Sequence, residues 1–381
     1  MRVCLVYDHL FPQTIGGAER WMRDLALYLA DAGHDVTYLT MRHWHASSPP
    51  ALEGVQVLGL TDAGRVYDED RRALGPPLRF GMAVGRHLAR HGRDYDVVHS
   101  ASFPFFPLLA AALMRRRGGY RLFVDWHEVW TLPYWRRYAG AVTGTIGWLV
   151  QRACIRTHQV AYCMSKMNAD RLVAEGYRGQ PIVLPGIYAG ATEPTPAAGV
   201  DSALVVYAGR HVREKRVGAL VRGFRKALQQ RPSLRLELYG DGPERGAVEV
   251  LVHDLGLTES VRVAGHRPEE EVDLALGRAA CLATASEREG YGLVVVEAAA
   301  RGTPVVVVAG PENGAVELVE EETNGAIARS ADPDELAAAI LRVVEAGPDL
   351  RASTERWFEQ NAARLRIDAS LELVAEGYRR A

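Results

Sequence analysis

Short apolar runs alternate with longer segments of helical periodicity along almost the whole chain. None of these runs alternates strictly between apolar and polar residues, so both faces of each are apolar, as in parallel strands buried between helices. The runs expected to be strands are 3–7, 36–39, 55–58, 97–99, 122–124, 160–163, 182–184, 204–207, 234–238, 261–263, 281–284 and 305–308. The pattern predicts an α/β protein with doubly wound parallel sheets.

The chain is long enough for two domains. It has 381 residues, and single hydrophobic cores stop growing at about 250–300 residues. Periodicity is lost from Pro185 to Gly199, where proline, glycine and threonine replace it, so this segment is the expected linker. We therefore predict two Rossmann-like domains, residues 1–188 and 200–361. The tail after Arg351 has the apolar spacing of one or two amphipathic helices and must pack on a domain already formed.

Composition and charge exclude several classes of protein. The formal net charge of −2 gives no general attraction for nucleic acid. The four cysteines show neither a disulfide framework nor metal-ligand spacing. The longest apolar candidate for a membrane span, residues 138–150, is shorter than the roughly 20 residues that a bilayer requires. The N-terminus enters a strand at once, without the features of a signal peptide. We expect a cytoplasmic protein.

One region departs from this balance of charge. Between Ala111 and His158 the acidic residues are Asp125 and Glu128, against eight arginines with four tryptophans interleaved. These are Arg115, Arg116, Arg117, Arg121, Arg136, Arg137, Arg152 and Arg156, with Trp126, Trp130, Trp135 and Trp148. The pattern suits peripheral contact with the anionic inner face of a membrane. The alternative is an ordinary solvated surface of an arginine-rich protein.

The strongest local signal for chemistry is the segment 286–304, which follows the predicted strand 281–284. Glycines lie at the turn, a helix opens after it, and Gly302-Thr303-Pro304 precedes the next strand. Backbone N–H groups and the positive end of the helix dipole make such a turn an anion site at the carboxyl edge of a sheet. The residues of this predicted phosphate site are Gly290, Tyr291, Gly292, Leu293 and Val294.

Two carboxylates flank the predicted phosphate site. Glu289 lies before the helix start and Glu297 about a turn and a half beyond it, roughly 10 Å apart at about 1.5 Å of rise per residue. That spacing suits a diphosphate that bridges a sugar and a ribose. Glu289 would accept hydrogen bonds from the sugar hydroxyls and Glu297 from the ribose. The alternative is a pair of solvated helix acids.

Arg210 and Lys215 follow the first predicted strand of the second domain and flank a short turn. Their cations would stabilise the negative charge of a departing diphosphate. Charged residues on a solvated loop are the alternative interpretation.

Three further candidates lie after strands, at the rim where ligands collect. Gly16 and Gly17 allow close approach of a backbone to a ligand, although a plain turn explains such a pair equally well, and the dinucleotide fingerprint is absent. Gly240, after strand 234–238, is a possible pocket wall or a turn. His127 follows strand 122–124 and could donate to a sugar hydroxyl, although single histidines are more often structural, and His99 calls for the same caution.

Asp68-Glu69-Asp70 resembles a metal-binding D-x-D motif. It follows a polar loop rather than a long strand, so we predict no metal site there.

Taken in order, the Gly-Gly-Ala-Glu segment at 16–19, Arg210 with Lys215, the Gly-Asp-Gly-Pro turn at 240–243 and the glutamate pair resemble family 4 retaining glycosyltransferases of the GT-B fold. The most specific piece is Glu289 and Glu297 with seven residues between them, which is similar to the E-x7-E element of that family. The residues after it are Ala298, Gly302 and Pro304. One departure is Pro185-Gly186-Ile187, which lacks the asparagine that often precedes this glycine in the family.

The resemblance implies two domains facing each other across a cleft, the first on the acceptor side, with a C-terminal helix at about 362–381 crossing back to it. Glu289 would face the donor sugar, Glu297 the ribose, and Arg210 with Lys215 the diphosphate. Gly17 would approach from across the cleft, and His127 is similar to the histidine that lines the sugar site.

The activity implied by the resemblance is transfer of a hexosyl group from a UDP- or GDP-linked sugar to a hydroxyl acceptor, with retention at the anomeric carbon and without a metal ion or other cofactor. The acceptor would be a sugar or lipid-linked sugar, in polysaccharide, glycolipid or glycoconjugate synthesis. Nucleotide-sugar 2-epimerases share the architecture and remain an alternative. A non-catalytic nucleotide-sugar-binding protein is a third.

Overall fold

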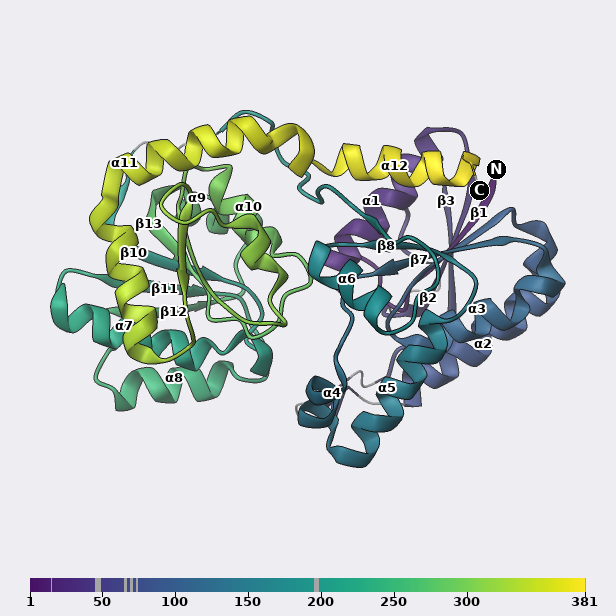
Figure 1. The fold of residues 1–381 in the computed structure, drawn as a ribbon, viewed down its shortest axis with the longest axis horizontal. Coiled ribbons are helices and arrows are strands. Elements are labelled where there is room, and N and C mark those ends of the chain that lie inside the picture. The colour runs from purple at the N-terminus through teal and green to yellow at the C-terminus, as the bar shows by residue number, and fades with distance from the viewer. Residues whose placement is uncertain are drawn as a thin grey trace. The chain divides into compact units, whose positions relative to one another are not determined.

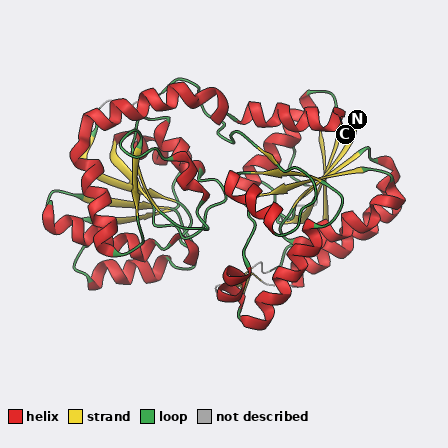
Figure 2. Cartoon of the chain, in the orientation of Figure 1, coloured by secondary structure: helices red, strands yellow, loops and turns green. Residues whose placement is uncertain are grey.

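The computed structural model describes residues 1–14, 16–44, 49–64, 67–68, 71–72, 75–194 and 199–380. The chain forms two compact α/β units (Figure 1). The first unit comprises Met1–Pro185 together with the segment from Asp368 onward, and the second comprises Gly186–Ile367. Each unit has a parallel sheet with helices packed around it, as Figure 2 shows, so the predicted α/β class is confirmed.

The sheet of the first unit has the strand order β3-β2-β1-β6-β7-β8-β9, and all of its paired strands are parallel. Its strands are β1 (Arg2–Val6), β2 (Asp35–Arg42), β3 (Val55–Asp62), β6 (Val97–Ala101), β7 (Arg121–Trp126), β8 (Val160–Cys163) and β9 (Ile182–Val183). A separate antiparallel pair, β4 (Tyr67–Asp68) and β5 (Arg71–Arg72), was not predicted. Of the discounted D-x-D motif, Glu69 and Asp70 lie outside the described residues.

The helices of the first unit bury large aromatic side chains against this sheet, among them Trp21 of α1 and Phe80 of α2. They are α1 (Gly17–Asp31), α2 (Gly75–His91), the 3-10 turn η1 (Gly92–Asp94), α3 (Phe105–Gly118), α4 (Leu132–Ala139), α5 (Ala141–Ile155), α6 (Lys166–Ala174) and most of α12 (Ile367–Arg380).

The last helix of the chain, α12, packs against the first-unit sheet. The hydroxyl of Tyr378 lies 2.5 Å from Nδ1 of His99, and its ring meets Phe123 edge to face at 4.7 Å between centroids. The Arg121 guanidinium donates to the Tyr378 carbonyl. The prediction that a C-terminal helix returns to the first domain is therefore confirmed.

The second unit has the strand order β12-β11-β10-β13-β14-β15, again with parallel pairing throughout. The strands are β10 (Asp201–Ala208), β11 (Arg235–Tyr239), β12 (Val261–Gly265), β13 (Ala279–Ala283), β14 (Val305–Val308) and β15 (Gly325–Ala328). The helices are η2 (Arg213–Lys215), α7 (Val217–Gln230), α8 (Arg245–Asp254), α9 (Glu269–Arg278), α10 (Leu293–Ala299), η3 (Gly314–Leu318) and α11 (Pro333–Leu365). Within α11 the helix is interrupted at Gly347, which has φ 52° and precedes Pro348.

Backbone contacts join the start of the expected linker to the end of α11. The N–H of Tyr188 donates to the Leu365 carbonyl at 3.0 Å, and the N–H of Ile367 donates to the Tyr188 carbonyl at 2.9 Å. A Cβ atom at Gly186 would lie 2.0 Å from the Leu365 carbonyl oxygen. Only glycine allows this approach without a shift of the backbone. Residues 195–198 of the linker lie outside the described residues.

Across the described ranges no helix is long and apolar enough to cross a membrane.

Candidate active site

The second-unit sheet has a switch point between β10 and β13. From β10 the strand order continues outward to β11 and β12, and from β13 it continues the other way to β14 and β15. Loops that leave the carboxyl ends of two such strands diverge, and ligands of open α/β sheets bind in the resulting crevice. The loop after β10 carries Arg210 and Lys215, and the loop after β13 carries Glu289. The structure thus brings these sequence-predicted residues to one edge of one sheet.

Lys215 and Glu289 form an ion pair at this edge. The Nζ atom of Lys215 lies 2.5 Å from Oε1 of Glu289, and the Ser286 hydroxyl donates to the same oxygen at 2.8 Å. The two side chains are only 17% and 15% exposed. Within the described part of the chain, Oε2 of Glu289 accepts no hydrogen bond and Nζ of Lys215 makes no other one. The sequence analysis assigned the two residues to separate parts of a ligand, whereas here they pair with each other.

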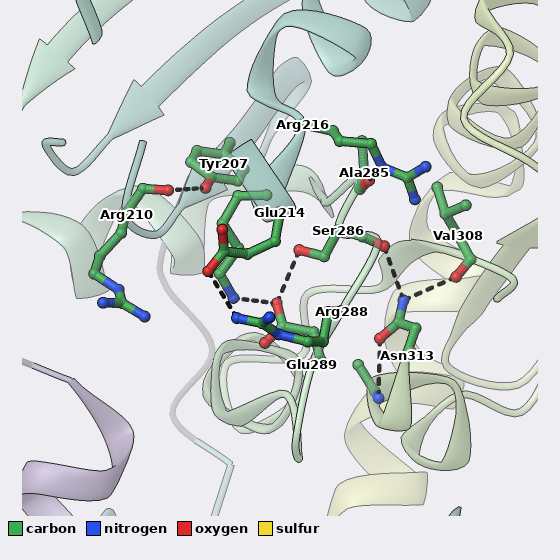
Figure 3. A network of polar contacts seen from close by, with 12 residues as sticks. Tyr207, Arg210, Glu214, Arg216, Ala285, Ser286, Arg288, Glu289, Val308 and Asn313 are labelled. Atoms are coloured by element: carbon green, nitrogen blue, oxygen red, sulfur yellow. Dashed lines mark hydrogen bonds and ion pairs between the residues drawn. The ribbon is translucent and has the colours of Figure 1, made fainter. Parts of the chain in front are cut away.

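Three contacts hold the loop after β10 against the loop after β13, and Figure 3 includes the side chains of Glu214, Arg216 and Arg288 that take part in them. The backbone N–H of Glu287 donates to the Glu214 carbonyl at 2.7 Å, and the guanidinium of Arg288 donates to the Glu214 carboxylate at 2.9 Å. The guanidinium of Arg216 donates to the Ala285 carbonyl at 2.9 Å. These contacts fix the backbone on both sides of the Lys215–Glu289 pair.

Asn313, which was not predicted from the sequence, supports the Glu289 loop from the segment after β14. Its side-chain amide donates to the Val308 carbonyl at 2.8 Å and accepts from the Ala315 N–H at 3.1 Å. The backbone of Glu289 pairs with this segment, since its carbonyl accepts from the Gly314 N–H at 2.9 Å. The available signal was the Asn-Gly turn that follows β14 at the same edge of the sheet.

Arg210 lies at the same edge but apart from the Lys215–Glu289 pair in Figure 3. Its side chain is exposed, and its carbonyl accepts a hydrogen bond from the Tyr207 hydroxyl at 2.9 Å. Glu297 lies on α10, half-buried, and its carbonyl accepts from the Arg301 guanidinium at 3.1 Å. Burial raises the pKa of the Tyr188 hydroxyl, the Arg301 guanidinium opposes this rise, and the negative charge of Glu297 adds to it less strongly.

Helix α10 begins at Leu293, so Gly290, Tyr291 and Gly292 lie in the turn before it and Val294 lies in its first turn. Gly292 has φ 104°, and a Cβ atom there would lie 2.5 Å from the Cβ of Ala315. Both the conformation and the space require glycine. The segment therefore has a tight turn before the helix, as the sequence predicts.

The conformation of Gly240 is required by backbone packing. Its φ is 116°, and a Cβ atom there would lie 1.9 Å from the Gly209 carbonyl oxygen. The Gly209 N–H in turn donates to the Tyr239 carbonyl at 3.0 Å. Gly240 thus brings the loop after β11 against the loop that carries Arg210.

The remaining predicted site residues belong to the first unit. Gly16 has an extended backbone with φ −179°, which any residue adopts, while a Cβ atom at Gly17 would meet no atom within 4 Å. His127 follows β7, and its Nε2 atom is buried without a hydrogen-bond partner in the described part of the chain. Burial lowers the pKa of His127, which favours the neutral imidazole.

His99 belongs to a buried structural network. Its Nε2 atom lies 2.9 Å from Oδ1 of Asp125, whose other oxygen accepts from the Trp21 indole N–H at 2.7 Å. Burial acts to raise the pKa of the Asp125 carboxyl, but His99 and, less strongly, His127 and Trp21 hold it below its usual value. Because His99 also contacts Tyr378, the network joins α1, β6, β7 and α12.

No group of three or more His, Cys, Asp or Glu in the described ranges is placed to hold a metal ion. Within the same ranges the four cysteines are buried and form no disulfide.

Comparison with known proteins covers most of the chain. Residues 15–185 match the model described as Glycosyltransferase Family 4, and residues 194–363 match the model described as Glycosyl transferases group 1. Glycogen synthase of Mycobacterium tuberculosis is 27% identical over 404 residues, which cover 98% of this chain and 92% of the relative.

Solved structures share the fold at lower sequence identity. Sucrose-phosphate synthase from Thermosynechococcus elongatus aligns with a TM-score of 0.83 and 21% identity over 99% of this chain and 98% of that one. Anabaena HepE, solved in complex with UDP and glucose, aligns with a TM-score of 0.76 and 18% identity over 100% of both chains. The two parallel-sheet units and these matches define a glycosyltransferase of the GT-B fold. The chain belongs to glycosyltransferase family 4.

Proposed function

We propose that this glycosyltransferase moves a hexosyl group from a nucleoside-diphosphate sugar to a hydroxyl group of a sugar or lipid-linked sugar, with retention at the anomeric carbon. The observation that carries the proposal is the Lys215–Glu289 pair at the switch point of the second-unit sheet. Lys215 keeps ammonium N–H groups for phosphate oxygens, and Glu289 keeps one carboxylate oxygen for sugar hydroxyls. A sugar joined to a diphosphate needs both kinds of partner side by side.

The other predicted site residues have roles in this proposal that follow from their chemistry. Arg210 joins Lys215 in stabilising the negative charge that develops on the leaving diphosphate. Glu297 accepts hydrogen bonds from the ribose hydroxyls. In the first unit, His127 donates to a hydroxyl of the transferred sugar, and the open space beside Gly17 admits a ligand close to the backbone.

The backbone of the turn at residues 290–294 contributes N–H donors to the phosphates. Such donors carry no formal charge, but they are fixed by the fold and need no rearrangement when the diphosphate departs.

The proposed reaction is attack on the same face from which the diphosphate leaves. The bond between the anomeric carbon and the diphosphate oxygen breaks first, giving an oxocarbenium-like sugar that the diphosphate and its cations stabilise. The acceptor oxygen then bonds to the anomeric carbon, and its proton passes to the departing phosphate oxygen. The charge is neutralised by side chains of the protein, so the step requires no metal ion.

The names of related proteins support the donor and acceptor classes. One relative, whose similarity covers 98% of this chain, is a glycogen synthase. A structural neighbour was solved with UDP and glucose. These proteins support a nucleotide sugar as donor and a carbohydrate as acceptor.

A thermal-shift screen against uridine and guanosine nucleotides identifies the base, because a ligand that binds only the folded state raises the melting temperature. Release of nucleoside diphosphate from the matching sugar donor is then measured with and without glucose oligomers, glycolipid fractions and inositol phosphates as acceptors. Release that depends on an acceptor supports transfer. Conversion of the donor without any acceptor supports an epimerase, and binding without turnover supports a non-catalytic protein; either result overturns the proposal.

Chelation tests the role of metal separately. Addition of EDTA is expected to leave the transfer rate unchanged. A loss of rate that returns with Mg²⁺ or Mn²⁺ would contradict the assignment of charge stabilisation to Arg210 and Lys215 alone.

A further inference from the structure

Helix α5 has an outer face that is apolar. Val142, Ile146 and Leu149 are 74%, 56% and 54% exposed. They are four and three residues apart, so they follow one another along one side of the helix, and the exposed Ala153 continues the row. Surface helices normally turn charged and polar residues to solvent. From Ala141 to Gln151 the helix has no charged residue at all.

The opposite face of α5 is already occupied by α4. A Cβ atom at Gly144 would lie 2.3 Å from the Trp135 carbonyl oxygen, and one at Gly147 would lie 2.6 Å from the Trp135 ring. The two glycines therefore let α4 pack closely on α5. Figure 1 shows α4 and the N-terminal end of α5 extending away from the sheet of the first unit. The exposed row, here called the α5 stripe (Val142, Ile146, Leu149 and Ala153), thus lies on the side of the helix that α4 does not cover.

Positive charge borders the α5 stripe. The guanidinium of Arg136 donates to the hydroxyl of Thr145, the residue before Ile146 on α5, at 3.0 Å. Arg156, which follows the end of α5, is exposed. It comes seven residues, or about two helical turns, after Leu149 and so lies on the same side of the helix axis. Arg137 is exposed on α4 next to Arg136.

Helix α5 carries no acidic residue, and one acid, Glu175, contacts its flank through Trp148 at 2.9 Å and Arg152 at 3.7 Å. The sequence has no aspartate or glutamate from residue 129 to residue 169. The nearest preceding acids are engaged elsewhere, since Asp125 is buried and Glu128 accepts from the Trp130 indole N–H at 2.8 Å. The surface therefore combines an apolar ridge with an arginine border, and Glu175 on the flank of the helix is engaged by Trp148 and Arg152.

We propose that the α5 stripe and its arginines form a docking surface for an anionic lipid bilayer. A helix of 15 residues is about 22 Å long, too short to cross a bilayer but long enough to lie in its interface. The apolar side chains enter the boundary between headgroups and acyl chains, and the guanidinium groups bind lipid phosphates. Arginine is attracted to an anionic leaflet within a Debye length, so binding depends on salt.

The surface connects the bilayer to the candidate site of the first unit. Helix α4 begins six residues after the carboxyl end of β7, and His127 lies in that connection. A protein bound through α5 would hold the carboxyl edge of this sheet near the membrane surface, where a lipid-linked acceptor is located.

Vesicle flotation of the full chain tests the proposal. The protein is mixed with phosphatidylcholine vesicles that contain or lack about a third phosphatidylglycerol, at low and at high salt. We expect flotation with the anionic vesicles at low salt, and weaker binding with neutral vesicles or at high salt. The substitution V142S/I146S/L149S is expected to lower the partition coefficient at least about tenfold, because each side chain loses its transfer from water.

A matched control uses exposed apolar residues of the second unit. Val250 and Leu274 are 60% and 63% exposed on α8 and α9, and V250S/L274S is expected to float like the wild type. Circular dichroism of both variants confirms that they fold. The proposal is overturned if the triple variant floats as well as the wild type. It is also overturned if the wild type floats with neither the anionic nor the neutral vesicles.

One further outcome would assign the surface to a different partner. If sedimentation equilibrium shows a dimer that V142S/I146S/L149S converts to a monomer, and the wild type ignores vesicles, the α5 stripe is an interface between copies of this chain and the membrane proposal fails.

Discussion

Substitution of Lys215 by alanine is the most informative perturbation of the candidate site. Two unit charges about 4 Å apart interact by about 4 kcal/mol at an effective dielectric constant of about 20, and Lys215 is 17% exposed, so screening is limited. Loss of one preorganised electrostatic stabiliser typically removes about 2.7–4 kcal/mol of transition-state stabilisation. We expect Lys215→Ala to lower kcat by about 100- to 1,000-fold, measured as nucleoside diphosphate released in the presence of acceptor.

The fold is expected to survive this substitution. Glu289 keeps its hydrogen bond from Ser286 at 2.8 Å, so the loss in free energy of unfolding is about 1.5–3 kcal/mol, the range for one charge-assisted bond. Denaturant unfolding measures this loss independently of kcat.

Lys226 provides a matched control in the same unit. Its Nζ atom lies 3.0 Å from Asp334, but the two side chains are 47% and 76% exposed. Such surface pairs contribute little, so Lys226→Ala should leave kcat unchanged and alter stability by less than about 1 kcal/mol. Wild-type turnover in Lys215→Ala, or an equal loss in Lys226→Ala, would refute the assignment of the diphosphate to this edge of the sheet.

Three other predictions follow from the structure. Arg210→Ala should lower kcat by about 100-fold with little change in unfolding, because its side chain is exposed; near-normal activity would mean that the leaving group lies elsewhere. Burial lowers the pKa of His127 and His211 below their usual value of 6.5, so the unfolded chain binds protons more readily, and stability should fall as pH drops below about 6.5; a flat profile of melting temperature from pH 7.5 to 5.5 would contradict this. Gly186→Ala should cost at least about 2 kcal/mol in denaturant unfolding, since its Cβ would lie 2.0 Å from the Leu365 carbonyl oxygen, and an unchanged midpoint would show that the backbone yields easily.

Most strands were predictable because they are buried on both faces and carry continuous apolar runs. The runs 160–163 and 305–308 coincide with β8 and β14. Strand β15, Gly325-Ala326-Ile327-Ala328, was missed because its intrinsic β-propensity is weak. It becomes a strand through its parallel pairing with β14, a tertiary contact that no local pattern reveals.

The C-terminal helices were also predicted only in part from the sequence. The apolar spacing of the tail predicted helices after Arg351, but α11 begins at Pro333 and continues through that residue. The helical conformation is interrupted at Gly347, so the part of α11 that follows Pro348 is a second helix that includes Arg351. The sequence predicted this second helix and α12 but not the helix from Pro333 to the break, which packs on the second-unit sheet.

The candidate site was predictable in position but not in its contacts. Residues that follow parallel strands must lie at one edge of the sheet, which placed Lys215 and Glu289 together. That β10 and β13 are neighbours is a property of strand order, so the direct ion pair between the two residues could not be predicted. The support from Asn313 was missed for the same reason, since it depends on β14 lying next to β13.

The anomeric configuration of the product is the most direct test of transfer on one face of the sugar. Proton NMR of the newly formed glycoside, recorded early in the reaction before any mutarotation, distinguishes the two stereochemical outcomes. Transfer on one face predicts the same configuration at the anomeric carbon as in the nucleotide-sugar donor. A product of inverted configuration would contradict departure and attack on one face of the sugar.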